Sequence, residues 1–396
     1  MTCSGSLCEE RGKYMKQNWK KIAAGFVAFA VFVAALIYCS RIEKKALIST
    51  AGQSYEKAEV VEITKDNLAE DGNRYGEQEV ILKIKSGSLK GQEVEAISPS
   101  GTLFGATCER GMKVIAIVSV TEDNRVVTVY SQDRSIVIYI FAIFFSLVVC
   151  VIGGWKGFKA VVSLAFAVVS IFGLLFPLIY KGYSPIIVTI LICVVATIFT
   201  MLMISGWTKK TLSAIIGTTC GVTAAGVSAL IFGHFAGISG YNVSDIETLN
   251  YVAQYTPIRI GEFLFAGIII SALGAVMDVG MSMSSAIQEI YEANPEVDRK
   301  KLFMSGIHVG RDMMGTMTNT LILAYVGGAM TTLIINYAYD LSYNQLLNSY
   351  NMGIEIMQGL AGSLGVVLTV PITAAVAVEL IYRNKSKQIR MINKIK

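Results

Sequence analysis

The sequence carries a series of apolar runs, each long enough to cross a lipid bilayer. A polar tail at residues 1–17 precedes the first run, at residues 18–40, and seven more lie between residues 136 and 382. A spanning helix needs about 20 mainly apolar residues, and soluble domains seldom repeat runs of this length. Only 16% of the residues are charged, against about 25% in an average soluble domain. We therefore predict a polytopic α-helical membrane protein with about eight transmembrane helices.

The boundaries of the seven later runs follow from hydropathy. They lie near residues 136–154, 158–180, 185–206, 212–235, 260–282, 313–337 and 359–382. Glycine and alanine recur at helical spacing in several of them, as in Gly217, Gly221 and Ala225, which predicts close helix packing in lipid.

The distribution of basic residues predicts the orientation. Lysines precede the first run, and no small-residue cleavage pattern follows it, so we expect an uncleaved anchor helix. Lysine and arginine cluster in the connections at residues 156–159, 209–210 and 299–301 and in the tail at residues 383–396, while the alternate connections carry few. Basic residues favour the cytoplasmic side of a membrane. Both termini are therefore expected in the cytoplasm.

Residues 45–132 differ in kind from the rest of the chain. Five short alternating runs are separated by turn-forming residues, and they cover Ala58–Ile63, Gln78–Ile84, Gln92–Ala96, Lys113–Val120 and Val126–Tyr130. Five short strands in under about a hundred residues are typical of a small closed or half-open β-barrel, either OB-like or SH3-like. Because the anchor helix runs outward, we expect this inserted domain to be extracytoplasmic.

Two neighbouring apolar runs contain charged and polar residues. The polar residues are Asp278 and Ser282 in the first run and Asp312, Thr316, Asn319 and Thr320 in or beside the second. An ionisable residue at the centre of a spanning helix costs roughly 2.5–3.5 kcal/mol on insertion scales and by default marks function. A short charged connection joins the runs, so the helices are antiparallel. Asp278 is then expected at a similar depth to residues 316–319, in the cytoplasmic half of the membrane.

A polar cavity open to the cytoplasm is the simplest arrangement that satisfies these groups. Their carboxylate, hydroxyl and amide oxygens suit a proton or a small cation, because hard cations prefer oxygen ligands. Arg311 and Glu379 both lie near the inner surface and are expected to pair as a gate. The structural alternative is an ion pair of Arg311 with Asp278 or Asp312 that only fixes helix packing.

Other chemistry is not indicated. The seven cysteines are scattered and form no disulfide framework, and no motif for a metal or another cofactor is present. The sequence contains no nucleophile elbow, phosphate-binding loop or HExxH motif, so we expect no enzymatic activity. The basic residues sit beside membrane spans, so we expect no nucleic-acid partner.

Two blocks of the polar hairpin resemble a known family. The blocks GAVMDVGMSMSSAIQEI and SGIHVGRDMMGTMTNTLILAYVGG are similar to those of the YibE/F-like proteins, which are bacterial multi-pass membrane proteins. The overall plan of anchor helix, extracytoplasmic β domain and helix bundle is similar too. The resemblance implies this architecture and a location in the bacterial cell membrane. It also supports functional importance for the polar residues in the two blocks, Arg311 included.

Two functional hypotheses remain open at this point. The first is an ion-coupled transporter or permease whose polar site lies between the helices at residues 260–282 and 313–337. The second is a non-catalytic scaffold or sensor whose β domain docks an extracytoplasmic protein. In both cases the lipid bilayer is the expected surrounding.

Overall fold

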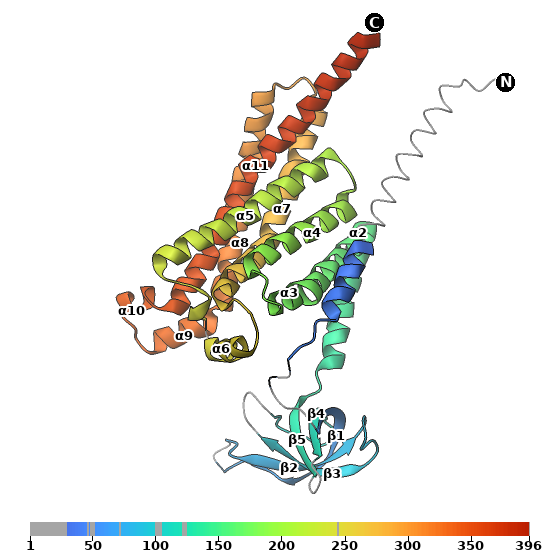
Figure 1. Cartoon of the computed structure of the whole chain (residues 1–396), viewed down its shortest axis with the longest axis vertical. Helices are drawn as coiled ribbons and strands as arrows, with labels where there is room; N and C mark the ends of the chain where they lie inside the picture. Colours follow the sequence, from blue (N-terminus) through green and yellow to red (C-terminus); the bar gives the residue numbers. More distant parts are fainter. Residues whose placement is uncertain are drawn as a thin grey trace, which may run out of the picture. The chain divides into compact units, whose positions relative to one another are not determined.

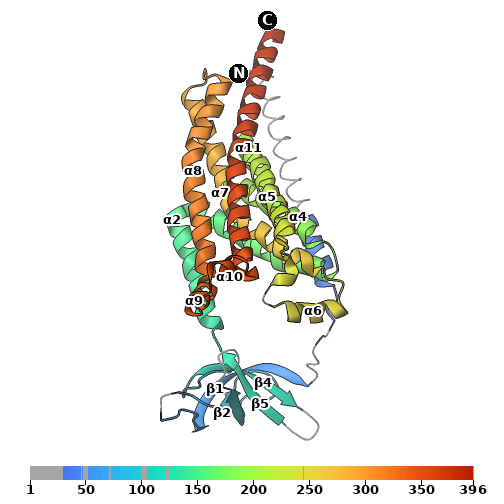
Figure 2. The same cartoon turned by 90° about the vertical axis from the view of Figure 1, so that its left-hand side faces the viewer.

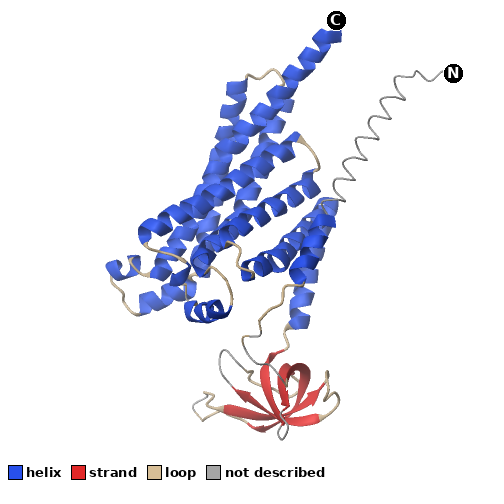
Figure 3. Ribbon diagram, in the orientation of Figure 1, coloured by secondary structure: helices blue, strands red, loops and turns tan. Residues whose placement is uncertain are grey.

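The structure is a computed structural model that describes residues 30–45, 47, 52–70, 73–99, 105–120, 125–243 and 245–395, with backbone only from residue 384. The chain divides into two compact units, a β unit at residues 46–152 and a helical unit that contains residues 30–45 and 153–395. All the described strands belong to the β unit (Figure 3). The predicted tail at residues 1–17 lies outside the described residues. Of the predicted anchor, the part that is described forms a helix, Ala30–Ser40.

The β unit contains a closed five-stranded barrel (Figure 1). Its strands are β1 (Gln53–Lys65), β2 (Glu77–Ile84), β3 (Glu93–Pro99), β4 (Lys113–Val120) and β5 (Arg125–Gln132). The order around the barrel is β1-β2-β3-β5-β4, and β1 pairs with both β2 and β4 to close it. Alternate side chains of β2 are buried, as the two-residue period of a strand requires. The predicted five-stranded barrel is confirmed.

One fully buried polar side chain helps to hold the barrel together. Gln78 donates from Nε2 to Asp66 Oδ1 at 2.9 Å, and its Oε1 accepts from the backbone N–H of Cys108 at 2.8 Å. Arg74 also pairs with Asp66, at 2.5 Å. Hydrogen bonds from Gln78 and Arg74 to the charged carboxylate lower the pKa of Asp66. Burial raises the pKa of the Cys108 thiol.

The remaining described elements are helical. They are α2 (Ser135–Ser170), η1 (Ile171–Leu175), α3 (Phe176–Tyr180), α4 (Pro185–Ser205), α5 (Lys209–Ala236), η2 (Gly240–Asn242), α6 (Ile246–Tyr255), η3 (Ile260–Glu262), α7 (Phe263–Ala293), α8 (Arg299–Gly328), α9 (Met330–Ala338), α10 (Tyr343–Leu347) and α11 (Tyr350–Ile395). Within the described chain, five helical stretches are long and apolar enough to cross a membrane, or six when α8 and α9 count as one bent span. The protein is therefore a multi-pass helical membrane protein with a β-barrel domain.

The helix count differs from the predicted eight at three places. The described part of the anchor, Ala30–Ser40, is shorter than a full span. The runs predicted at 136–154 and 158–180 form one helical stretch, Ser135–Tyr180, with non-helical backbone angles at Gly154 (φ 53°, ψ −136°). The run predicted at 313–337 is not one straight helix, because α8 and α9 meet at a 60° bend. Gly327 and Gly328 directly precede this bend, and glycine weakens a helix by roughly 0.5–1 kcal/mol relative to alanine.

Close packing of small residues forms the centre of the helical unit. A Cβ atom added to Gly221 of α5 would lie 2.8 Å from Val276 Cγ1 of α7 and 2.9 Å from the Gly365 carbonyl oxygen of α11. Ala225 and Val276 are fully buried in the same cluster. The backbones of α5 and α11 therefore approach as the small-residue spacing predicted.

Candidate functional site

Helices α7 and α8 pack against each other in a defined antiparallel register. A Cβ atom on Gly306 of α8 would lie 2.9 Å from Ile287 Cγ1 of α7. One on Gly310 would lie 2.9 Å from Met283 Sδ. A step of four residues forward along α8 thus corresponds to four residues back along α7. Helices α7, α8 and α11 run alongside one another (Figure 2).

This register sets the depth of the predicted polar residues. Continued by five residues beyond Gly310, it places Gly315 opposite Asp278. A hydrogen bond of 2.6 Å between the Tyr325 hydroxyl and Ser271 Oγ confirms that the two helices stay adjacent further along. Asp278 therefore lies level with the start of the segment 316–319 along the two helices.

The side chains of all the predicted site residues on α7 and α8 are exposed on the surface of this chain. The exposed residues are Asp278, Ser282, Arg311, Asp312, Thr316, Asn319 and Thr320. Among the described residues, no side-chain hydrogen bond or ion pair is made by Asp278, Arg311 or Asp312. The hydroxyls of Thr316 and Thr320 donate to carbonyl oxygens of their own helix.

The expected cavity enclosed between the two helices is therefore not formed by the described part of one chain. The reason is packing. The inward face of α7 is filled by Val276 and Met283, which are fully buried, and α8 buries Leu302 in the same apolar cluster. The polar faces are left on the outside, at a common depth.

The expected pairing of Arg311 with Glu379 is wrong. Glu379 pairs instead with Arg299, at the start of α8. Arg311 lies twelve residues further along the same helix, which is about 18 Å at 1.5 Å per residue. The expected structural pairs of Arg311 with Asp278 or Asp312 are also absent from the described contacts. Both members of the Arg299–Glu379 pair are more than half exposed, so the pair contributes little stability.

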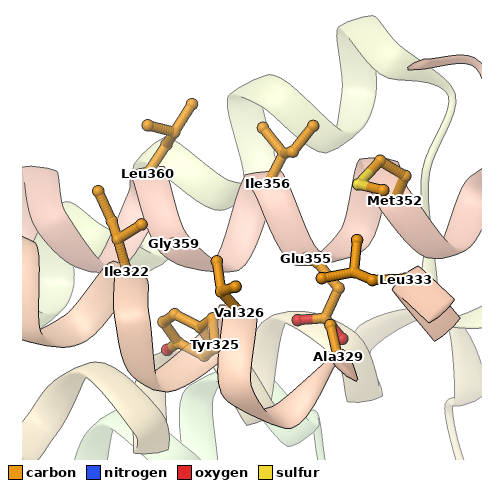
Figure 4. A pocket seen from close by; sticks show the side chains of 10 residues that line it. All are labelled: Ile322, Tyr325, Val326, Ala329, Leu333, Met352, Glu355, Ile356, Gly359 and Leu360. Carbon is orange, nitrogen blue, oxygen red and sulfur yellow. The ribbon is translucent and has the colours of Figure 1, made fainter. Parts of the chain in front are cut away.

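A second carboxylate, which the sequence reasoning missed, lies in a pocket of about 190 Å³ between α8, α9 and α11. Glu355 extends from α11 toward the bend between α8 and α9 (Figure 4). Apolar side chains such as Ile322 and Leu333 form most of the wall, and Tyr325 adds a ring. Glu355 makes no described ion pair or side-chain hydrogen bond.

A signal for Glu355 is present in the sequence. It is the one acidic residue between Tyr350 and Thr369, where small and apolar residues predominate. The predicted runs at residues 313–337 and 359–382 leave Glu355 in the connection between them. The structure instead begins α11 at Tyr350, so Glu355 lies within a candidate span, Tyr350–Arg383.

A larger hollow, of about 470 Å³, lies between the end of α5 and the start of α11. Phe232, Phe235, Tyr350 and Leu360 contribute to its walls. Among the described residues, no group of three or more histidine, cysteine, aspartate or glutamate side chains is arranged to hold a metal ion.

Comparison with known proteins places this arrangement in a family. The family model described as YibE/F-like protein matches residues 141–383. The chain belongs to the YibE/F-like family. The match begins within α2 and ends within α11, includes the polar face of α7 and α8, and excludes the five strands of the barrel. Neither the curated proteins nor the solved structures that were compared gave a match.

Proposed function

We propose that the helical unit is an ion-coupled transporter or permease that binds a proton or a small cation. The observation that carries the proposal is Asp278. It lies within the candidate span Ile260–Ala293, and no described residue neutralises it. An ionisable side chain inside a spanning helix is costly, by roughly 2.5–3.5 kcal/mol at the helix centre on insertion scales. Such a residue is expected only where it takes part in function or meets a partner.

The residues around Asp278 supply suitable ligands. Ser282 lies one turn further along α7, and Asp312 and Thr316 lie on α8 at a similar level, with Asn319 and Thr320 beyond them. Carboxylate, hydroxyl and amide oxygens suit a hard cation or a transferred proton. Arg311, which has no described partner, would attract an anionic group or compete with the cation. The proposal assigns no catalytic residue and no cofactor.

The bend between α8 and α9 supports the proposal. Many transporters place their sites at interrupted helices near the middle of the membrane. Glu355 of α11 lies against such an interruption, beside the C-terminal half of α8. It is a second protonatable group, whereas Asp312 lies in the N-terminal half of α8. A pair of carboxylates at different depths provides two stations for a proton.

The proposal includes an eight-span topology with both termini in the cytoplasm and the barrel outside the cell. The break at Gly154 divides the stretch Ser135–Tyr180 into two spans, and α8 with α9 makes one. The closed five-stranded barrel supports the OB-like or SH3-like domain that the proposal places outside the cell. Labelling of intact cells with a membrane-impermeant thiol reagent tests the topology. Glu95→Cys should react and Lys209→Cys should not, and the reverse pattern would overturn the orientation.

Proton flux in proteoliposomes tests the transport proposal. The wild-type chain, reconstituted with a pH-sensitive dye inside the vesicles, should carry protons faster than empty vesicles when a Na⁺, K⁺ or pH gradient is imposed. Asp278→Asn should remove most of this flux, and Glu379→Gln, which alters an exposed surface pair, should retain it. Wild-type flux equal to that of empty vesicles for every gradient tried would reject these coupling ions. Full flux in Asp278→Asn would remove Asp278 from the mechanism.

A docking role for the barrel is a second proposal, supported by two exposed aromatic residues on its surface. The rings of Tyr55 and Tyr130 meet edge to face, with centroids 5.4 Å apart. Aromatic residues are enriched at protein interfaces. Deletion of residues 45–132 separates the two roles, because a transporter would keep its proton flux, whereas a docking module would lose an extracytoplasmic protein in a pull-down.

A further inference from the structure

The exposed face of α7 is a stripe of small and polar residues. Its members are Gly267, Ser271, Gly274, Asp278 and Ser282, at spacings of four, three, four and four. This spacing places them on one side of the helix. Among the described residues, nothing lies within 4 Å of a Cβ atom built on Gly267 or Gly274. In lipid, such stripes let a second helix approach closely.

A matching row on α8 lies beside this stripe. Tyr325 bonds to Ser271 of the stripe, so the helical row that contains Tyr325 borders it. Counting back along that row at helical spacing gives Thr318, Gly315 and Arg311. A Cβ atom on Gly315 also meets nothing within 4 Å among the described residues. The stripe, together with the exposed residues Gly315 and Arg311 of this row, forms the open α7–α8 face, and Thr318, whose hydroxyl is buried, lies at its edge.

The charges of the open α7–α8 face are self-complementary. It presents the carboxylate of Asp278 and, about one helical turn away in register, the guanidinium of Arg311. Both are exposed and neither has a described partner. Exposure of either charge to lipid is costly. In a two-fold interface the same patch meets itself, so an acidic group of one copy can face a basic group of the other.

We propose that two copies of this chain associate through the open α7–α8 face, with Asp278 of each copy facing Arg311 of the other. Gly274 and Gly315 provide the close backbone approach, and the partner copy covers a polar face that one chain leaves open. The inference goes beyond the proposed transport function and does not depend on it. If transport also holds, the second copy completes the wall of the polar site.

The first test measures association in nanodiscs or vesicles by single-molecule photobleaching at varied protein density. The wild type should bleach mainly in two steps. Gly274→Leu should weaken association by more than about tenfold, because interfaces of this kind depend on close helix approach. Ala165→Leu is the matched control, since it makes a similar change on an exposed part of α2, and should leave association unchanged. A wild-type chain that bleaches in one step at every density would overturn the proposal.

The second test reverses the charges. Asp278→Arg and Arg311→Asp should each reduce association, and the double variant should restore it, because the pair is rebuilt across the interface. Failure of the double variant to recover, while it still inserts and resists proteolysis as the wild type does, would overturn the pairing. Cross-linking of Gly315→Cys mainly to a different protein in native membranes would also overturn the proposal. Proton flux is measured separately, so loss of the dimer and loss of transport are distinguishable.

Discussion

The contact between α5, α7 and α11 offers the sharpest test of how the helical unit is held together. Gly221→Ala adds one methyl group at the point where three helices meet. The new Cβ would overlap Thr369 Oγ1 and lie 2.8 Å from Val276 Cγ1 and 2.9 Å from the Gly365 carbonyl oxygen. The Thr369 hydroxyl already donates to that carbonyl at 2.7 Å, and this hydrogen bond holds the threonine side chain in its present conformation. The carbonyl is backbone and moves only if α5 and α11 separate.

The size of the effect follows from two opposing contributions. Overpacking a filled core by one methylene typically costs about 1–3 kcal/mol. Replacing glycine by alanine in a helix returns about 1 kcal/mol. The expected net loss for Gly221→Ala is therefore about 0–2 kcal/mol, centred near 1 kcal/mol. Gly327→Ala is the matched control, because nothing described lies within 4 Å of its Cβ and only the helix-favouring contribution applies.

Thermal unfolding in detergent, followed with a dye that becomes fluorescent on reaction with newly exposed thiols, measures this difference. The buried thiol of Cys193, 3% exposed, reports the opening of the helical unit. Gly221→Ala should unfold a few degrees below the wild type, since about 1 kcal/mol corresponds to roughly 2–4 °C in a unit of about 150–250 residues, close to the size of the helical unit. Gly327→Ala should unfold at or above the wild-type temperature. An unfolding temperature for Gly221→Ala equal to that of Gly327→Ala would refute the packing argument.

Three further predictions concern local interactions. Gly87→Ala should increase amide exchange in the barrel more than Gly111→Ala does. Both residues have φ near +80°, but only at Gly87 would a Cβ atom overlap the Glu56 carboxylate. Equal exchange in the two variants would show that backbone strain alone determines the loss of stability. The lowered pKa of Asp66 stabilises the folded barrel above the unfolded pKa, and this contribution is lost as pH falls through the folded value. Barrel exchange, corrected for intrinsic rates, should thus rise below about pH 4 in the wild type and less steeply in Asp66→Asn, and parallel curves would contradict the assignment. Glu379→Gln should change the free energy of unfolding by less than about 1 kcal/mol, because both partners of its ion pair are exposed. A larger loss of stability in the thiol-dye assay would mean that the pair is shielded from water.

Some of the fold could be read from residues that lie near one another in the chain. The alternation at Gln78–Ile84 predicted a strand with one buried face, and β2 buries every second residue. The spacing of Gly217, Gly221 and Ala225 predicted close packing, and all three are buried. Both patterns are local, because they depend only on the period of a strand or a helix.

The candidate site could be predicted only in part. The helical period placed Asp278 and Ser282 on one face, and the short connection before α8 set the depth at which they meet the second helix. The direction in which that face points was not predictable. It depends on which side of α7 is occupied by Val276 and Met283, and those contacts come from segments distant in sequence.

The sequence by itself determined that the chain crosses a membrane, that a small barrel is inserted near its start and that charges interrupt one pair of apolar helices. Each of these conclusions rests on the composition or the periodicity of a single segment. Composition decides whether a segment is stable in lipid, and periodicity decides which of its side chains share a face. Only the tertiary structure decided that Glu379 pairs with Arg299 rather than Arg311, that Glu355 enters a pocket at a helix bend and that the polar face around Asp278 lies open. These outcomes depend on the register between helices, which is set by side-chain packing across the bundle and has no local signature in the chain.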